Sequence, residues 1–136
     1  MNKIYITKLY KMYDVNNSAF MMDKKIYNSL EDAIETSKKI IEMDCSKINN
    51  FCNTDINLNT VEDYNNYLKY LEEKYHIDYE IFISEVYDID ESDIGRKFID
   101  YCNDTKDNDP EDFILSLGNS NNYIYDYNGN RIGKFL

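Results

Sequence analysis

The chain has 136 residues, of which 43% are hydrophobic and 30% are charged, and its formal net charge is −11. A chain of this length can bury an adequate core without disulfides or metal ions, and its single proline and four glycines leave no stretch typical of a linker. We therefore expect one domain over residues 1–136. Binding to DNA or RNA requires a basic face, so this charge argues against direct nucleic-acid binding.

The amino-terminal stretch MNKIYITKLYKMYDV alternates polar and apolar residues. It lacks the continuous apolar run of a secretory signal or of a membrane span. The three cysteines form no CxxC pair, which is typical of reduced thiols in a reducing compartment. These features predict a cytoplasmic protein that does not enter a membrane.

The same alternation predicts a strand over residues 1–13 that is at least partly covered on both sides. Residues 16–18 have the composition of a turn, and residues 19–27 are expected to form the hairpin partner of the first strand. The chain is thus predicted to begin with two antiparallel strands.

Two capping boxes predict the starts of two helices. The first, SLED at Ser29, precedes apolar residues at helical spacing and predicts a helix over about residues 30–44. Residues 45–59 show no clean period and are expected to form a loop. The second box, TVED at Thr60, begins a helix whose buried stripe is predicted to be Val61, Tyr64, Leu68, Leu71 and Tyr75.

The second half of the chain is predicted to complete a sheet. Residues 79–89 have apolar side chains at both parities, as a central strand has. A third helix is expected over residues 92–102 and a fourth between Asp109 and Gly118. The order β-β-α-α-β-α-α-β-β predicts an α+β fold: a mainly antiparallel sheet of about five strands with helices packed on one face.

The closing segment contains GNRIGK, which is similar to a phosphate-binding loop. Such a loop needs four residues between its glycines and a hydroxyl after the lysine, whereas Gly129 and Gly133 enclose three residues and phenylalanine follows the lysine. Asn128-Gly129 instead predicts a hairpin with a two-residue type I′ turn that sets Asp126 opposite Arg131.

Signatures of catalysis and metal binding are weak. His76 is the only histidine, and we expect it beside the C-terminal carbonyls of the second helix. Cys45 and Cys52 are separated by six residues, which is not a ligand spacing. The acidic runs DIDESDIG and DNDPED lack the glycine and the glutamate that a calcium loop needs. We predict no enzyme activity, no metal site and no cofactor.

The negative charge is concentrated in one part of the chain. Residues 78–112 contain thirteen acidic and three basic residues, whereas residues 1–28 have a net charge of +3. An acidic run is commonly a solvated face, but carboxylates on a rigid surface can also compete for the groove of a basic nucleic-acid-binding protein. The predicted partner-binding carboxylates are Asp88, Asp90, Glu91, Asp93, Asp104, Asp107, Asp109, Glu111 and Asp112.

Tyrosine is abundant, with fourteen copies and no tryptophan. Most tyrosines are expected at half-buried positions, but exposed tyrosines are rigid contact residues that are enriched at protein interfaces. Tyr67 and Tyr70 lie beside the predicted apolar stripe of the second helix. They complete the predicted partner-binding residues.

Taken together, the sequence predicts a small acidic binding protein that occupies a protein partner, such as a phage-encoded anti-defence inhibitor or a toxin-neutralising immunity protein. The alternative is a protein that binds or sequesters a small nucleotide-type signal, with tyrosines stacking on a base; an enzyme is the third hypothesis. The alternative requires both terminal hairpins to border one pocket, where the phosphates would be held by Lys3, Lys8, Lys11, Lys24, Lys25, Arg131 and Lys134.

Overall fold

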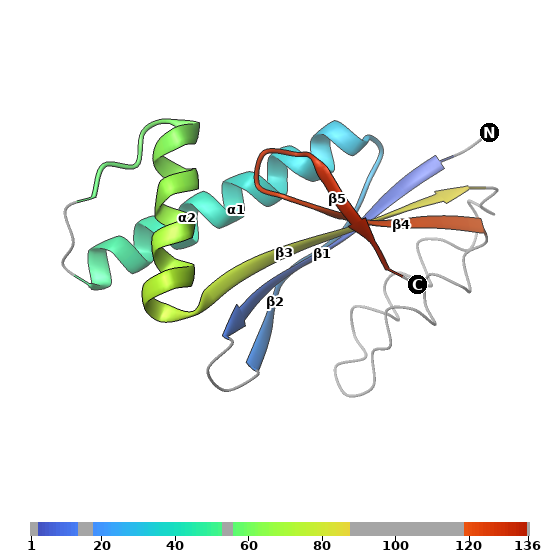
Figure 1. Ribbon diagram of the computed structural model, residues 1–136. Coiled ribbons are helices and arrows are strands. Elements are labelled where there is room, and N and C mark those ends of the chain that lie inside the picture. The colour runs from blue at the N-terminus through green and yellow to red at the C-terminus, as the bar shows by residue number, and fades with distance from the viewer. Residues whose placement is uncertain (1–2, 14–17, 53–55, 88–118, 136) are drawn as a thin grey trace.

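One antiparallel sheet of five strands is packed against two helices in the computed structural model, which describes residues 3–13, 18–52, 56–87 and 119–135 (Figure 1). The strand order in the sheet is β2-β1-β3-β4-β5. This confirms the predicted α+β class. The helices predicted at 92–102 and between Asp109 and Gly118 lie outside the described residues. In chain order the elements are β1 (Lys3–Tyr13), β2 (Ser18–Tyr27), α1 (Leu30–Phe51), α2 (Val61–Tyr75), β3 (Ile77–Tyr87), β4 (Asn119–Tyr125) and β5 (Arg131–Lys134).

Strand β1 lies between β2 and β3 and is covered on both faces, as predicted. It pairs with β3 along its whole length, from Lys3 opposite Tyr87 to Tyr13 opposite Ile77. Successive side chains of a strand point to opposite faces, yet four consecutive residues from Ile6 to Leu9 are buried. Strand β1 therefore has the burial of an inner strand on both faces, in agreement with its place between β2 and β3.

The predicted caps begin both helices. The hydroxyl of Ser29 accepts a hydrogen bond from the backbone N–H of Asp32 at 3.1 Å. At the start of α2 the bonds are reciprocal, because Thr60 Oγ1 accepts from the N–H of Asp63 and Asp63 Oδ2 accepts from the N–H of Thr60. The backbone N–H groups of Asn59 and Thr60 lower the pKa of Asp63, so this carboxylate stays ionised at neutral pH.

Helix α1 is longer than predicted. It continues to Phe51, and the prediction of a loop from residue 45 was wrong for this part of the chain. The reason is that Cys45, which is fully buried, lies four residues after Ile41, and Ile48 packs against the same core. A cysteine that behaves as a small apolar residue thus extends the buried stripe by two turns.

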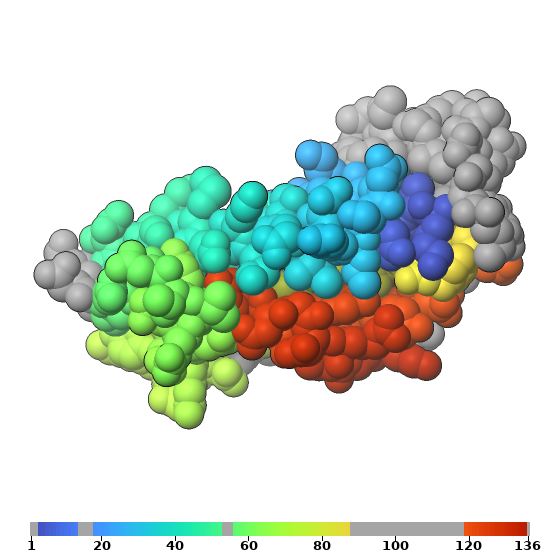
Figure 2. All heavy atoms as spheres, turned by 90° about the horizontal axis from the view of Figure 1, so that it is seen from above, coloured from blue at the N-terminus to red at the C-terminus, as the bar shows by residue number. Residues whose placement is uncertain are grey.

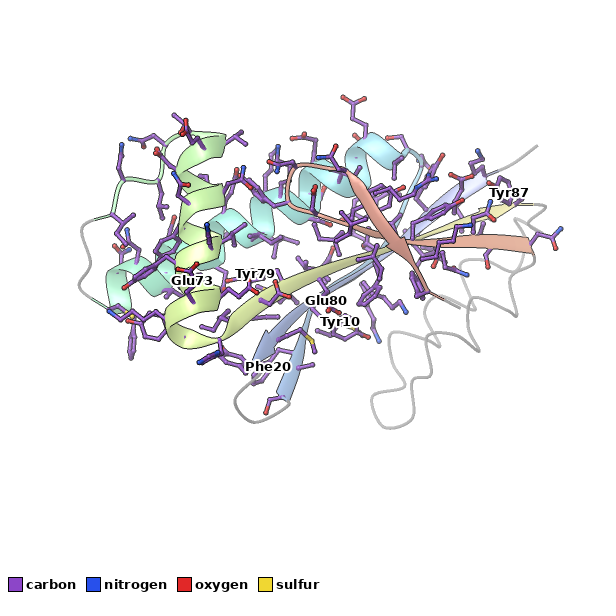
Figure 3. The ribbon with its side chains drawn as sticks, in the orientation of Figure 1. Tyr10, Phe20, Glu73, Tyr79, Glu80 and Tyr87 are labelled. Carbon is purple, nitrogen blue, oxygen red and sulfur yellow. The ribbon has the colours of Figure 1, made fainter. Side chains whose placement is uncertain are left out.

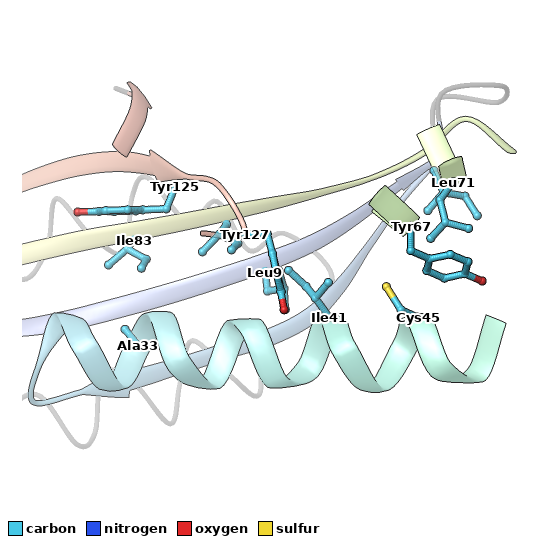
Figure 4. Packing of buried hydrophobic residues seen from close by; sticks show 11 residues of the cluster. Leu9, Ala33, Ile41, Cys45, Tyr67, Leu71, Ile83, Tyr125 and Tyr127 are labelled. Atoms are coloured by element: carbon cyan, nitrogen blue, oxygen red, sulfur yellow. The ribbon is translucent and has the colours of Figure 1, made fainter. Parts of the chain in front are cut away.

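The core lies between the sheet and the two helices, and Figure 4 shows its packing. Figure 4 places Ala33, Ile41 and Cys45 on the side of α1 that faces β1, where Leu9 is 0% exposed. Helix α2 adds Tyr67 and Leu71. The buried members are Leu9, Ala33, Ile41, Cys45, Tyr67, Leu71, Ile77, Ile81, Ile83, Tyr125 and Tyr127.

The closing hairpin differs from the predicted type I′ turn. Gly129 has φ +85°, but Asn128 does not have a positive φ. The N–H of Gly129 donates to the carbonyl of Asp126 at 3.0 Å and the N–H of Asp126 donates to the carbonyl of Asn130 at 2.9 Å. The loop therefore has three residues, 127–129, with a glycine in the left-handed region. Arg131 consequently pairs with Tyr125 and not with Asp126.

Replacing Gly129 with alanine is expected to destabilise the protein by about 1–2 kcal/mol, the usual cost of a side chain in the left-handed region. The added Cβ would also lie 3.2 Å from Cγ2 of Ile34 on α1. Gly133→Ala is the control, because its Cβ would meet only Cδ1 of Ile124 at 3.7 Å. Urea unfolding measures both variants, and equal losses would contradict the role given to Gly129.

Candidate binding cleft

A cleft of about 490 Å³ lies between α2, β3 and the β4–β5 hairpin. It exists because β4 pairs with β3 only from Ile81 onward, whereas β3 begins at Ile77. Figure 2 shows the hairpin beside α2 on this side of the molecule. The lining residues are Ile41, Asn65, Leu68, Lys69, Glu72, Ile77, Asp78, Tyr79, Glu80, Ile81, Ile124, Tyr125, Asp126, Tyr127, Asn128 and Ile132.

Carboxylates dominate the charge of this cleft. Glu72, Asp78, Glu80 and Asp126 line it, and Lys69 is the basic residue among its lining residues. A cleft lined by one sign of charge concentrates ions of the other sign. The electrostatics therefore favour a cationic ligand and disfavour a phosphate.

Three tyrosines form rigid walls of the cleft. The hydroxyl of Tyr127 donates to Glu42 Oε1 at 2.6 Å, and the hydroxyl of Tyr79 donates to Asp44 Oδ2. Burial, and then these hydrogen bonds to carboxylates, raise the pKa of both phenols, which stay neutral. The hydroxyl of Tyr125 accepts from Arg131 at 3.5 Å. Because each hydroxyl is hydrogen-bonded to a neighbouring side chain, the three rings have fixed positions.

Behind the cleft, Asp44 connects three elements. Its Oδ2 lies 2.9 Å from Nζ of Lys11 on β1, and it also accepts from Tyr79 on β3. Burial lowers the pKa of Lys11, but the hydrogen bonds and the electrostatic attraction of Asp44 and Tyr13 together outweigh this effect, so the net pKa is raised. Lys11 is therefore protonated, and Asp44 compensates its charge within the fold. Its ammonium group is thus not available to bind a ligand.

A pair of amides closes one end of the cleft. Asn65 on α2 donates to Asn128 Oδ1 at 2.8 Å, and Asn128 donates back to Asn65 Oδ1 at 3.2 Å. The two residues are 63 positions apart in sequence. These two hydrogen bonds hold the hairpin against α2 and so set the width of the cleft.

The predicted partner-binding residues do not form this cleft. The nine carboxylates from Asp88 to Asp112 lie outside the described residues. Tyr67 is 1% exposed, so its assignment as a surface contact is corrected: it is a core residue whose ring stacks on Tyr70 at 5.8 Å. Tyr70 is half-buried, and its hydroxyl accepts from Lys74 at 3.1 Å.

The basic residues that the nucleotide alternative requires are not brought together. The hairpin of β1 and β2 lies at one edge of the sheet, and β5 lies at the opposite edge. Lys3 pairs with Glu85 at 3.2 Å, and Lys8 is 4% exposed. Among the described residues there is thus no common pocket for Lys24 and Arg131.

The sequence did not predict that four residues would lie together in one cleft: Glu72, Tyr79, Glu80 and Asp126. Their proximity depends on where β4 ends relative to β3, and no local pattern encodes this end point. One usable signal was the contrast between the long strand predicted at 79–89 and the short strands of the closing hairpin. Unequal neighbouring strands leave part of the longer one without a partner.

His76 and the two described cysteines show no catalytic arrangement. His76 is exposed and ends α2 in the left-handed conformation, with φ 56°, and its N–H donates to the carbonyl of Glu72. It thus caps the helix end beside which it was expected. In the described part of the chain, no three His, Cys, Asp or Glu residues gather in a way that could hold a metal ion.

Cys45 is expected to react at least tenfold more slowly than Cys52 with iodoacetamide at about pH 8, because the thiolate is the reactive form. Cys45 is fully buried, and burial raises the pKa of its thiol to about 12. Peptide mapping by mass spectrometry measures both rates, and they should converge in urea. Equal rates in the native protein would show that α1 opens around Cys45.

No helix within the described ranges combines the length and the apolar character that crossing a membrane requires. Comparison of the chain with protein-family models, with curated proteins and with solved structures finds no match.

Proposed function

We propose that this protein is a small acidic binding protein that acts by occupying a basic surface of a protein partner, as an anti-defence inhibitor or a toxin-neutralising immunity protein does. The observation that supports this proposal is the cleft, whose lining contains four carboxylates and one ammonium group. A nucleic-acid-binding protein presents a surface of the complementary charge. The proposed partner is therefore of this class.

The rim of the cleft has the mixed character of a protein interface. Ile132 lines the cleft and is 63% exposed, so it offers an apolar contact beside the carboxylates. Tyr125 and Tyr127 line the same cleft, and rings that are already fixed lose little entropy on binding. The carboxylates would steer a basic partner toward this apolar and aromatic centre.

Affinity capture from host lysate tests the proposal. The immobilised protein is expected to retain a basic partner at about 0.05 M salt and to lose it at about 0.5 M, since salt screens such contacts. Short duplex DNA should displace the same partner. The variant Glu72→Gln with Glu80→Gln, which removes two cleft charges, should retain at least tenfold less of it.

The matched control is Glu73→Gln, next to Glu72 on α2 but not among the cleft residues. It makes the same chemical change on the same helix and should retain the partner fully. If no partner is retained, or if the cleft variant and the control retain it equally, the proposed function of the cleft is wrong.

Association kinetics with the captured partner test the acidic run that was predicted from the sequence. If residues 104–112 belong to the contact surface, the triple variant Asp107→Lys, Asp109→Lys and Glu111→Lys should slow association and reduce its salt dependence. Unchanged association in a folded triple variant would assign this run to the solvated surface and leave the cleft as the contact site.

A further inference from the structure

Strand β3 has an edge without a neighbouring strand inside the cleft. It pairs with β1 from Ile77 to Tyr87, but with β4 only from Ile81 to Tyr87. Figure 1 shows β3 continuing toward α2 beyond the end of β4. Among the described residues, the segment 77–80 therefore has a strand on one side and the cleft on the other.

The direction of the backbone groups follows from the register. In β4, Asn122 accepts from Phe135 and Asp126 donates to Asn130, so even-numbered residues of β4 point toward β5. Odd-numbered residues, such as Tyr125, point toward β3 and exchange hydrogen bonds with its odd-numbered residues. By the same alternation, the N–H and C=O groups of Ile77 and Tyr79 point into the cleft.

One observation supports this direction independently. The N–H of Tyr79 donates to the side-chain Oδ1 of Asp78 at 2.9 Å, not to β1. A side chain thus occupies a backbone donor that a neighbouring strand would otherwise use. An incoming strand can take over this donor in place of the side chain of Asp78.

The two faces of this segment differ in character. Ile77 and Tyr79 belong to the core beneath the helices, whereas Asp78 and Glu80 project from the other face, where Glu80 lies opposite Tyr10 of β1. Figure 3 labels Tyr79, Glu80 and Tyr10 in this region. A strand laid along the edge would therefore meet apolar and acidic positions alternately.

We propose that this edge of β3 receives an extended segment of the partner as an added antiparallel strand, in which basic and apolar residues alternate. This inference rests on the proposed function and specifies the element that the cleft recognises. Basic residues lie opposite Asp78 and Glu80, and apolar residues lie opposite Ile77 and Tyr79. The backbone of Tyr79 exchanges two hydrogen bonds with the apolar residue opposite it.

The probe is the peptide acetyl-Arg-Val-Arg-Val-amide, which spans residues 77–80 only, because Tyr125 of β4 already lies opposite Ile81. Its first valine is placed opposite Tyr79. Two derivatives separate strand pairing from charge attraction. Methylation of the backbone nitrogen of the first valine removes an N–H that points to β3, whereas methylation of the backbone nitrogen of the arginine that follows it removes one that points away. Both derivatives have the same mass and the same charge.

Binding of the three peptides is followed by NMR of the full chain, together with hydrogen exchange of the Tyr79 amide. The parent peptide and the arginine-methylated peptide are expected to bind with similar affinity and to slow exchange at Tyr79. The valine-methylated peptide should bind at least tenfold more weakly and give no protection.

Equal affinity of the two methylated peptides, or unchanged exchange at Tyr79, would overturn the added strand and leave the charge-based function in place. The same holds if the parent peptide fails to bind while lysate capture still yields a partner that depends on the cleft charges. If both experiments fail, the proposed function itself is wrong.

Discussion

Replacing Tyr67 with alanine is expected to lower the free energy of unfolding by about 3–5 kcal/mol, the range for removing a buried aromatic side chain. Tyr67 is 1% exposed, belongs to the main core cluster and is the largest fully buried side chain among the described residues. Its removal leaves a cavity between α2 and α1 that the surrounding helices cannot fill. Urea unfolding monitored by circular dichroism measures the loss.

Tyr70→Ala is the matched control on the same helix. Tyr70 is half-buried and stacks on Tyr67, so its loss should cost roughly 1 kcal/mol. Equal losses for the two variants would contradict the burial of Tyr67. In a binding assay, Tyr67→Ala should reduce partner capture only in proportion to the unfolded fraction, because this side chain does not reach the surface.

The burial of Tyr67 shows which part of the prediction for α2 was right and which was not. The predicted stripe of α2 began at Val61, which is 50% exposed in the structure. A stripe through Tyr64, Tyr67 and Leu71 has the same helical spacing and matches the buried side. Periodicity predicted that one face is buried, but two stripes rotated by a fraction of a turn fit the sequence almost equally.

The fold was predictable because its signals are local. The alternation in β1 and the caps at Ser29 and Thr60 depend on residues within one turn or one strand. The cleft was not predictable in this way. It depends on the end of β4 relative to β3 and on a hairpin loop in which the carboxylate of Asp126 binds the N–H of Asn130 at 2.8 Å.

The hairpin illustrates the same limit. The dipeptide Asn128-Gly129 suits a type I′ turn, but it also suits a three-residue loop that needs only Gly129 in the left-handed region. The side chain of Asp126, which accepts from the N–H of Asn130, favours the longer loop. The longer loop shifts the strand pairing by one residue, so that Arg131 lies opposite Tyr125. The Cζ atom of its guanidinium group then lies 3.5 Å from the centre of the Tyr123 ring.

Replacing Asp44 with alanine is the second large effect that we expect, with a loss of roughly 2–3 kcal/mol. This is somewhat less than the 3–5 kcal/mol typical of breaking a fully buried ion pair, because the side chains of Lys11 and Asp44 are 13% and 18% exposed. The variant leaves the ammonium of Lys11 and the hydroxyl of Tyr79 without their shared acceptor. Thermal or urea unfolding measures the loss.

The pH dependence of stability gives a second measurement. The pKa of Lys11 is raised in the folded state, so its contribution is complete below about pH 10.4, the ordinary value for lysine, and is lost as the pH rises through the folded-state pKa. The raised pKa of Tyr79 acts in the same direction, since its phenol ionises more readily in the unfolded chain. Alkaline destabilisation should therefore be weaker in the Asp44→Ala variant.

A double-mutant cycle separates the ion pair from the packing of its methylene groups. The double variant Lys11→Met with Asp44→Leu removes both charges and should be more stable than either single variant, because no buried charge is left unpaired. The surface pair of Lys3 and Glu85, in which Lys3 is 38% exposed, is the control, and Lys3→Met should cost less than about 1 kcal/mol. If the losses from Lys11→Met and Asp44→Leu simply add in the double variant, the pair is not coupled and Asp44 does not connect β1, α1 and β3 as the geometry indicates.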